Sequence, residues 1–156
     1  MKSESLGLAL WVAICVGGGA LIGFATQGGD SAWYASLDKP SWTPPSWVFG
    51  PVWTALYAAM AVAAWLVWRE GGWRHQAAPL TVFLAQLALN FAWSPLFFGL
   101  RQIAWALVDI VVLWVTIVIT IRMCGCVNGA AAWLLAPYLA WVSFATALNA
   151  AILRLN

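Results

Sequence analysis

Five long apolar runs dominate this sequence and limit the folds that it can adopt. They cover about residues 6–26, 47–68, 79–99, 103–122 and 130–152. Each run is about 20 residues long, and a helix of that length crosses a hydrocarbon core about 30 Å thick. Backbone groups find no water inside a bilayer, so each run must satisfy them within a helix. We therefore predict an all-α membrane protein, a bundle of five transmembrane helices forming a single domain over residues 1–156.

The composition supports the membrane class. Hydrophobic residues make up 64% of the chain and charged residues only 8%, whereas soluble domains carry roughly a quarter charged residues. The net charge of +2, without any basic run, excludes a nucleic-acid partner. The first run follows Met1-Lys2 and could be a signal peptide, but it is too long and no A-x-A-like cleavage site follows it. We predict a retained first helix. The side of the membrane that holds the N-terminus carries slightly more basic residues, so we predict that the N-terminus lies inside.

One connection between the runs is much longer than the others. It covers about residues 27–46, whereas the remaining connections, about 69–78, 100–102 and 123–129, are short. Long loops in compact bundles are often functional lids. Pro44-Pro45 restricts the backbone where this loop enters the second span. We predict that the loop forms a lid over one end of the bundle.

The third run carries polar side chains that lipid cannot satisfy. Gln86, Asn90, Trp93 and Phe97 share one helix face, and Pro95 after Ser94 allows a kink. Buried amides in membrane bundles either bond neighbouring helices or line a cavity. Both interpretations stay open for Gln86. For Asn90, mid-span beside a tryptophan, we favour a cavity.

Several aromatic residues lie too deep for the membrane interface, where aromatic belts form. Trp53 and Tyr57 are one turn apart in the second run, and the fifth run places Tyr138 near Trp141. These rings, with Trp93, could simply pack between helices. Helix contacts in lipid favour small residues, however, so facing rings are more typical of a cavity wall.

The sequence contains no recognisable catalytic or metal site. The single histidine, His75, lies in a loop, and the three cysteines lack nearby metal-ligand partners. Asp109, inside the fourth run, could be structural or functional. Gly19 and Gly23 form a GxxxG pattern, which favours close helix contact within the bundle or across a homodimer.

Three segments carry a resemblance to a known family. They are KPSWTPPSW at residues 39–47, Asn90 together with Trp93-Ser94-Pro95, and PYLAWVSFATALN at residues 137–149. With these segments the chain resembles a bacterial member of the translocator protein / tryptophan-rich sensory protein family (TspO/MBR), from about Gly18 to Arg154.

The resemblance implies a five-helix bundle, commonly dimeric, that binds protoporphyrin IX, haem or other tetrapyrroles in a pocket beneath the first loop. The resemblance implies no required cofactor. The implied role is a translocator or sensory protein in porphyrin transport, regulation or stress response, in the bacterial cell envelope membrane. Matching positions would place these residues in the pocket: Tyr34, Pro44, Trp53, Asn90, Ser94, Trp141, Phe144, Ala145 and Leu148. To these, the residue patterns add Tyr57, Trp93 and Tyr138.

The resemblance also leaves alternatives open. Some bacterial members are reported to degrade protoporphyrin in light, and the implicated positions correspond to Trp53 and Trp141 here. Any enzymatic activity would then depend on light and oxygen. Animal members bind cholesterol through a pattern in the last helix, but the tyrosine of that pattern is an alanine between Leu148 and Arg154, so specific cholesterol binding is not expected. Porphyrin carboxylates would need a basic partner near water, and Lys39 is the nearest candidate.

Overall fold

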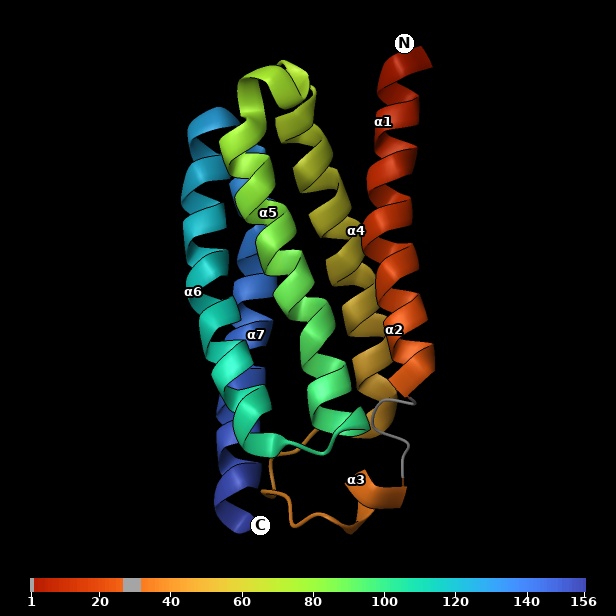
Figure 1. Ribbon diagram of the computed structural model, residues 1–156, viewed down its shortest axis with the longest axis vertical. Coiled ribbons are helices and arrows are strands. Elements are labelled where there is room, and N and C mark those ends of the chain that lie inside the picture. Colours follow the sequence, from red (N-terminus) through yellow and green to blue (C-terminus); the bar gives the residue numbers. More distant parts are fainter. Residues whose placement is uncertain (1, 27–31) are drawn as a thin grey trace.

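The computed structural model of this protein describes residues 2–26 and 32–156. Within these residues five helices are long and apolar enough to cross a membrane: Glu4–Thr26, Ser46–Trp68, Gly72–Gly99, Ile103–Val127 and Gly129–Leu155. The helices run side by side, and the two termini lie at opposite ends of the bundle (Figure 1). The predicted fold class is therefore confirmed: the protein is an all-α, multi-pass integral membrane protein.

The first span is built in three parts. α1 (Lys2–Val12) leads through a π-helical turn, η1 (Ala13–Gly17), into α2 (Gly18–Thr26). None of the α2 residues is buried. α2 is therefore a thinly covered part of the bundle wall.

Glycines in the first span let aromatic rings of neighbouring helices pack directly on its backbone. A Cβ added at Gly19 would overlap the ring of Tyr57, and one added at Gly18 would lie 2.7 Å from Cζ of Phe91. Gly23 has open space around it. Gly19, the first glycine of the GxxxG pattern, therefore makes a helix contact within the chain. The pattern no longer supports the homodimer in particular, which stays a prediction.

The second and third spans are joined by a much shorter turn than expected. α4 (Phe49–Trp68) and α5 (Gly72–Ser94) are separated only by residues 69–71, with Gly71 at φ +127°. Helical structure thus starts well before the apolar run at Pro79. A break at Gln76 (φ −117°, ψ 27°) explains this, because the proline then lies near the start of a new helical segment, where its missing N–H costs little.

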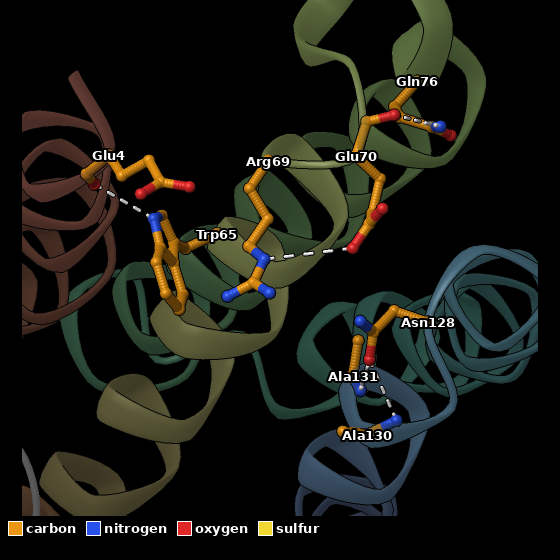
Figure 2. Close-up of polar contacts among 8 residues, drawn as sticks. All are labelled: Glu4, Trp65, Arg69, Glu70, Gln76, Asn128, Ala130 and Ala131. Atoms are coloured by element: carbon orange, nitrogen blue, oxygen red, sulfur yellow. Dashed lines mark hydrogen bonds and ion pairs between the residues drawn. The ribbon is translucent and has the colours of Figure 1, made fainter. Parts of the chain in front are cut away.

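Side-chain contacts organise the same end of the bundle (Figure 2). Nε1 of Trp65 donates to the carbonyl of Glu4, which ties α4 to α1. α6 (Ile103–Val127) and α7 (Gly129–Leu155) are joined by Asn128 alone. Its Oδ1 accepts from the backbone N–H groups of Ala130 and Ala131, a side-chain cap that starts α7 directly after α6.

At the opposite end, the third span finishes in a second π-helical turn, η4 (Pro95–Gly99). The ring of a proline inside a helix clashes with the carbonyl four residues earlier, so the backbone widens there. The N–H of Leu100 closes the turn on the carbonyl of Pro95 at 2.8 Å. This wider turn brings Phe97 and Phe98 toward the loop that we predicted as a lid.

Residues 27–31 of the predicted loop lie outside the described residues. Residues 32–45, called the lid below, contain the short helix α3 (Ala32–Ser36) and lead through a 3-10 turn, η3 (Ser46–Val48), into α4. α3 lies beneath the end of the bundle at which the chain terminates (Figure 1). The lid is therefore placed to close that end.

Candidate functional site

A cavity of about 940 Å³ lies inside the lid end of the bundle. Its wall comes from α2, α4, α5, α6 and α7, with Tyr34 of α3 at the end. Aromatic side chains form much of this wall: Phe24, Phe49, Trp53, Tyr57, Trp93, Phe97, Phe98 and Trp141. Among the described residues, the lining includes no charged side chain and no histidine, so this part of the wall offers a ligand rings and neutral hydrogen-bonding groups.

α4 contributes a stacked pair of rings. Trp53 and Tyr57 are four residues apart, and in a helix this spacing places them on the same face. Their ring centroids are 5.4 Å apart with an interplanar angle of 28°. The Tyr57 ring rests on the α2 backbone, where Gly19 leaves room for it. The pair therefore presents an extended aromatic surface whose position depends on a glycine.

The third span, α5 continued by η4, contributes a second stacked pair and several polar groups. Trp93 and Phe97 stack with centroids 5.1 Å apart at 23°. Nε1 of Trp93 donates to Oδ1 of Asn149 at 3.1 Å, which fixes the indole against α7. The Ser94 hydroxyl lies 2.9 Å from that of Thr26. These bonds hold the α5 wall to both α7 and α2.

α7 contributes an indole with an unused donor. Trp141 lines the cavity, and its Nε1 is buried without a hydrogen-bond partner. The Phe144 ring packs beside it at 5.4 Å, and the Trp42 ring of the lid packs on Phe144 at 5.7 Å. A buried N–H without an acceptor costs about 1–3 kcal/mol. A ligand acceptor in the cavity would remove that cost.

A line of hydrogen bonds runs from the cavity wall into the core. The Tyr57 hydroxyl donates to Oδ1 of Asn90 at 2.5 Å, and Nδ2 of Asn90 donates to the Tyr138 hydroxyl at 3.0 Å. The Tyr138 hydroxyl in turn donates to Oε1 of Gln86 at 2.8 Å. We call these side chains the relay. Tyr57 and Asn90 line the cavity, whereas Tyr138 and Gln86 are fully buried behind it.

The lid is held by its own side chains and by the last residue of the chain. Nζ of Lys39 donates to the carbonyls of Tyr34, Ala35 and Leu37. It also lies 4.9 Å from the centroid of the Tyr34 ring. The Asn156 amide pairs with the backbone of Asp38, accepting from its N–H and donating to its carbonyl. Burial raises the pKa of Tyr34, so the hydroxyl of this lid residue stays neutral.

These contacts give Lys39 a structural role in the lid, while a contact with a porphyrin carboxylate stays a prediction. An ammonium group has three N–H donors, and the carbonyls at the end of α3 engage all of them. Lys39 therefore caps a short helix of the lid. Arg101 and Arg154 are the other basic side chains of the described residues at this end; both are exposed, and the Arg101 guanidinium lies 5.9 Å from the centroid of the Trp33 ring.

Most of the residues predicted for the pocket line this cavity: Tyr34, Trp53, Tyr57, Asn90, Trp93, Ser94, Trp141, Ala145 and Leu148. Pro44, Tyr138 and Phe144 do not line it. Tyr138 lies behind Trp53, with centroids 6.3 Å apart, and Phe144 lies behind Trp141. Whether the lining residues contact a ligand stays a prediction.

Sequence reasoning missed other parts of the wall. Asn149 lines the cavity and accepts a hydrogen bond from Trp93; the signal that could have found it is an amide inside an apolar run, where lipid offers it no partner. Other lining residues of α2 and α6, namely Gly23, Ile110 and Leu113, carry no polar or aromatic signal. Only the packing of the helices reveals them.

Among residues 2–26 and 32–156, those outside the cavity form no competing cluster of metal-binding side chains. No cluster of three His, Cys, Asp or Glu side chains that could hold a metal occurs among the described residues. Cys15 and Cys124 are buried free thiols, and Cys126 is exposed. Oδ2 of Asp109 is buried without a hydrogen-bond partner. The cavity is thus the feature on which a function can be argued.

Comparison with known proteins agrees with the resemblance seen in the sequence. The family model described as the TspO/MBR family matches residues 11–155. The human protein named "Translocator protein" is 51% identical over 126 residues, covering 80% of this chain and 75% of the human protein. "Tryptophan-rich protein TspO" of Chlorobaculum tepidum is 42% identical over 157 residues, covering 100% of this chain and 99% of the relative. "Tryptophan-rich sensory protein" of Cereibacter sphaeroides is 40% identical over 124 residues, covering 80% and 77%.

Proposed function

The chain belongs to the TspO/MBR family, and we propose that its cavity binds a flat tetrapyrrole such as protoporphyrin IX. The observation that carries this proposal is the aromatic cavity of about 940 Å³. Its volume lies near the upper end of the roughly 300–1,000 Å³ range of small-molecule sites. A porphyrin, a large flat π-system, needs a cavity of this size.

The wall also offers the geometry that a flat ring needs. The Trp53–Tyr57 and Trp93–Phe97 pairs present ring surfaces from the second and third spans. Contacts between aromatic rings contribute about 0.5–1.5 kcal/mol per pair beyond burial. The unpaired Nε1 of Trp141 supports the proposal further, because a ligand oxygen or nitrogen would satisfy it.

The porphyrin carboxylates would remain near water at the lid end. Lys39 has its donors engaged, so of the exposed basic side chains at this end, Arg101 and Arg154, we choose Arg101 for the test because it follows a cavity-lining segment. It lies three residues after Phe98, which lines the cavity. Arg101→Gln should weaken binding of protoporphyrin IX more than binding of its uncharged dimethyl ester.

The first experiment is a titration of protoporphyrin IX into purified protein in the dark, followed by tryptophan fluorescence and thermal stability. Binding in the cavity predicts saturable quenching, because several tryptophans line it, and a raised melting temperature. Absence of both effects at micromolar porphyrin would refute the proposal.

A second candidate function is light- and oxygen-dependent degradation of the bound porphyrin. Trp53 and Trp141 line the same cavity from α4 and α7, so both indoles could contact an excited porphyrin. Illuminating the complexes of wild type, Trp53→Phe and Trp141→Phe tests it. Equal porphyrin loss in all three, or in detergent alone, would remove this activity and leave a binding, transport or sensory role.

We propose the bacterial cell envelope membrane as the location of the protein. The support is the alignment with the Chlorobaculum tepidum relative, which covers 100% of this chain and 99% of that protein. Fractionation of the native host, with antibody detection, tests this directly. Recovery from another compartment would contradict it.

A further inference from the structure

The relay gives two residues outside the cavity a defined part in ligand binding. Gln86 and Tyr138 are fully buried and do not line the cavity. They lie on α5 and α7, and their hydrogen bonds reach the cavity only through Asn90.

Asn90 is the residue that the relay holds. Its amide can donate two N–H bonds and accept at its oxygen. One N–H goes to Tyr138, and the oxygen accepts from Tyr57. The second N–H and the remaining lone pair of the oxygen engage no other described residue, and the side chain is 5% exposed and lines the cavity. The amide therefore offers one donor and one acceptor to a ligand in a fixed orientation.

Gln86 determines which groups donate and which accept in the relay. Its Oε1 accepts from the Tyr138 hydroxyl, so the Tyr138 proton points away from Asn90 and its oxygen is left to accept from Nδ2. Nε2 of Gln86 is buried without a partner. The oxygen alone therefore links Gln86 to the cavity, and a residue that keeps this acceptor should keep the relay.

We infer that Gln86 and Tyr138 are positioning residues of the cavity, which hold the Asn90 amide in one orientation and so raise its affinity for a flat aromatic ligand with its own hydrogen-bonding groups. The physical basis is preorganisation: a side chain already held in its binding orientation loses less freedom when the ligand binds. This inference rests on the proposed porphyrin binding.

The test compares Tyr138→Phe and Gln86→Met, titrated with protoporphyrin IX. Tyr138→Phe removes one hydroxyl and keeps the ring, and Gln86→Met keeps the length of the side chain without its acceptor. Each should weaken binding by about three- to tenfold, the size of one lost hydrogen bond. Gln86→Glu, which retains an acceptor oxygen, should restore affinity. Thr120→Val, which removes another buried hydroxyl that bonds within α6, is the matched control and should leave affinity unchanged.

A double-mutant cycle with Asn90→Leu separates positioning from general destabilisation. If Gln86 and Tyr138 act through Asn90, neither substitution should weaken binding further in the Asn90→Leu background. Effects of the same size in both backgrounds would overturn the inference. So would unchanged affinity in the single variants.

A ligand-free measurement distinguishes this inference from the porphyrin proposal. The Asn90 side-chain amide can be observed by NMR in protein labelled with ¹⁵N-asparagine and assigned by its loss in Asn90→Leu. Tyr138→Phe and Gln86→Met should shift it, whereas Thr120→Val should not. Unshifted resonances would refute the positioning role even if porphyrin binds. If the wild type fails to bind porphyrin, the proposed function and the affinity effect fall together, and the resonances still decide whether the relay holds Asn90.

Discussion

Gly19→Ala tests the contact between the first span and the cavity wall. The new methyl group would overlap the Tyr57 ring, so the ring must move. Its movement would disturb the stack with Trp53 and the bond to Asn90. Gly17→Ala is the matched control, because nothing lies within 4 Å of a Cβ at Gly17.

The expected magnitude follows from three contributions. Replacing glycine by alanine in a helix stabilises it by about 1 kcal/mol at either position. At Gly19, overpacking costs about 1–3 kcal/mol, and weakening the Tyr57 hydrogen bond costs about 1 kcal/mol more. The balance is a loss of about 1–3 kcal/mol for Gly19→Ala against a gain of about 1 kcal/mol for Gly17→Ala.

Thermal unfolding in detergent measures this difference. For a chain of this size about 1 kcal/mol shifts the melting temperature by about 2–4 °C. Gly19→Ala should therefore melt several degrees below wild type, and Gly17→Ala slightly above it. A second substitution, Tyr57→Leu, should reduce the effect of Gly19→Ala because the ring is gone. Equal melting temperatures for the two alanine variants would refute the packing of Tyr57 on Gly19.

The remaining predictions concern the lid and the two indoles. Lys39→Met removes the ammonium that binds three carbonyls of the lid; porphyrin should dissociate at least about threefold faster in stopped-flow measurements, and an unchanged rate would contradict the capping role. Trp141→Phe should leave the melting temperature nearly unchanged, because its N–H has no partner, but weaken porphyrin binding about fivefold. Trp93→Phe should instead destabilise the protein by about 1–3 kcal/mol, since Oδ1 of Asn149 loses its donor. A lower melting temperature for Trp141→Phe than for Trp93→Phe would contradict these hydrogen-bond assignments. Burial raises the pKa of Tyr34 above its usual value of 10.0. The contribution of Tyr34 to stability should therefore be present below pH 10.0 and lost as the pH rises through the raised pKa. Unfolding followed by fluorescence across alkaline pH would detect this loss.

The number and class of the helices could be predicted from the sequence because lipid imposes simple rules on length and polarity. Helix ends were less predictable. The apolar run begins at Pro79, yet the helix begins at Gly72, because the break at Gln76 accommodates the proline. Asn128 likewise replaces a predicted loop by a one-residue cap.

The parts of the cavity wall formed by large aromatic or polar side chains could be predicted from the sequence. Trp53, Asn90 and Trp141 are large or polar groups too deep for the interface, and all line the cavity. Tyr138 shows the limit of this reasoning, because the register of α7 against α5 decides whether a ring faces the cavity or lies behind it. Lys39 shows another limit, since its hydrogen bonds to nearby backbone carbonyls could not be predicted from the sequence.

The central claim, that porphyrin binds inside this cavity, is tested most directly by filling the cavity. Ala145 lines it, and phenylalanine there would occupy space that a ligand needs without creating a buried clash in a cavity of about 940 Å³. Ala104→Phe, at an exposed position of α6, is the matched control. Equilibrium titration in the dark should show at least about tenfold weaker protoporphyrin binding for Ala145→Phe and wild-type affinity for Ala104→Phe. Equal affinity in both variants and wild type would place the porphyrin elsewhere and contradict the account.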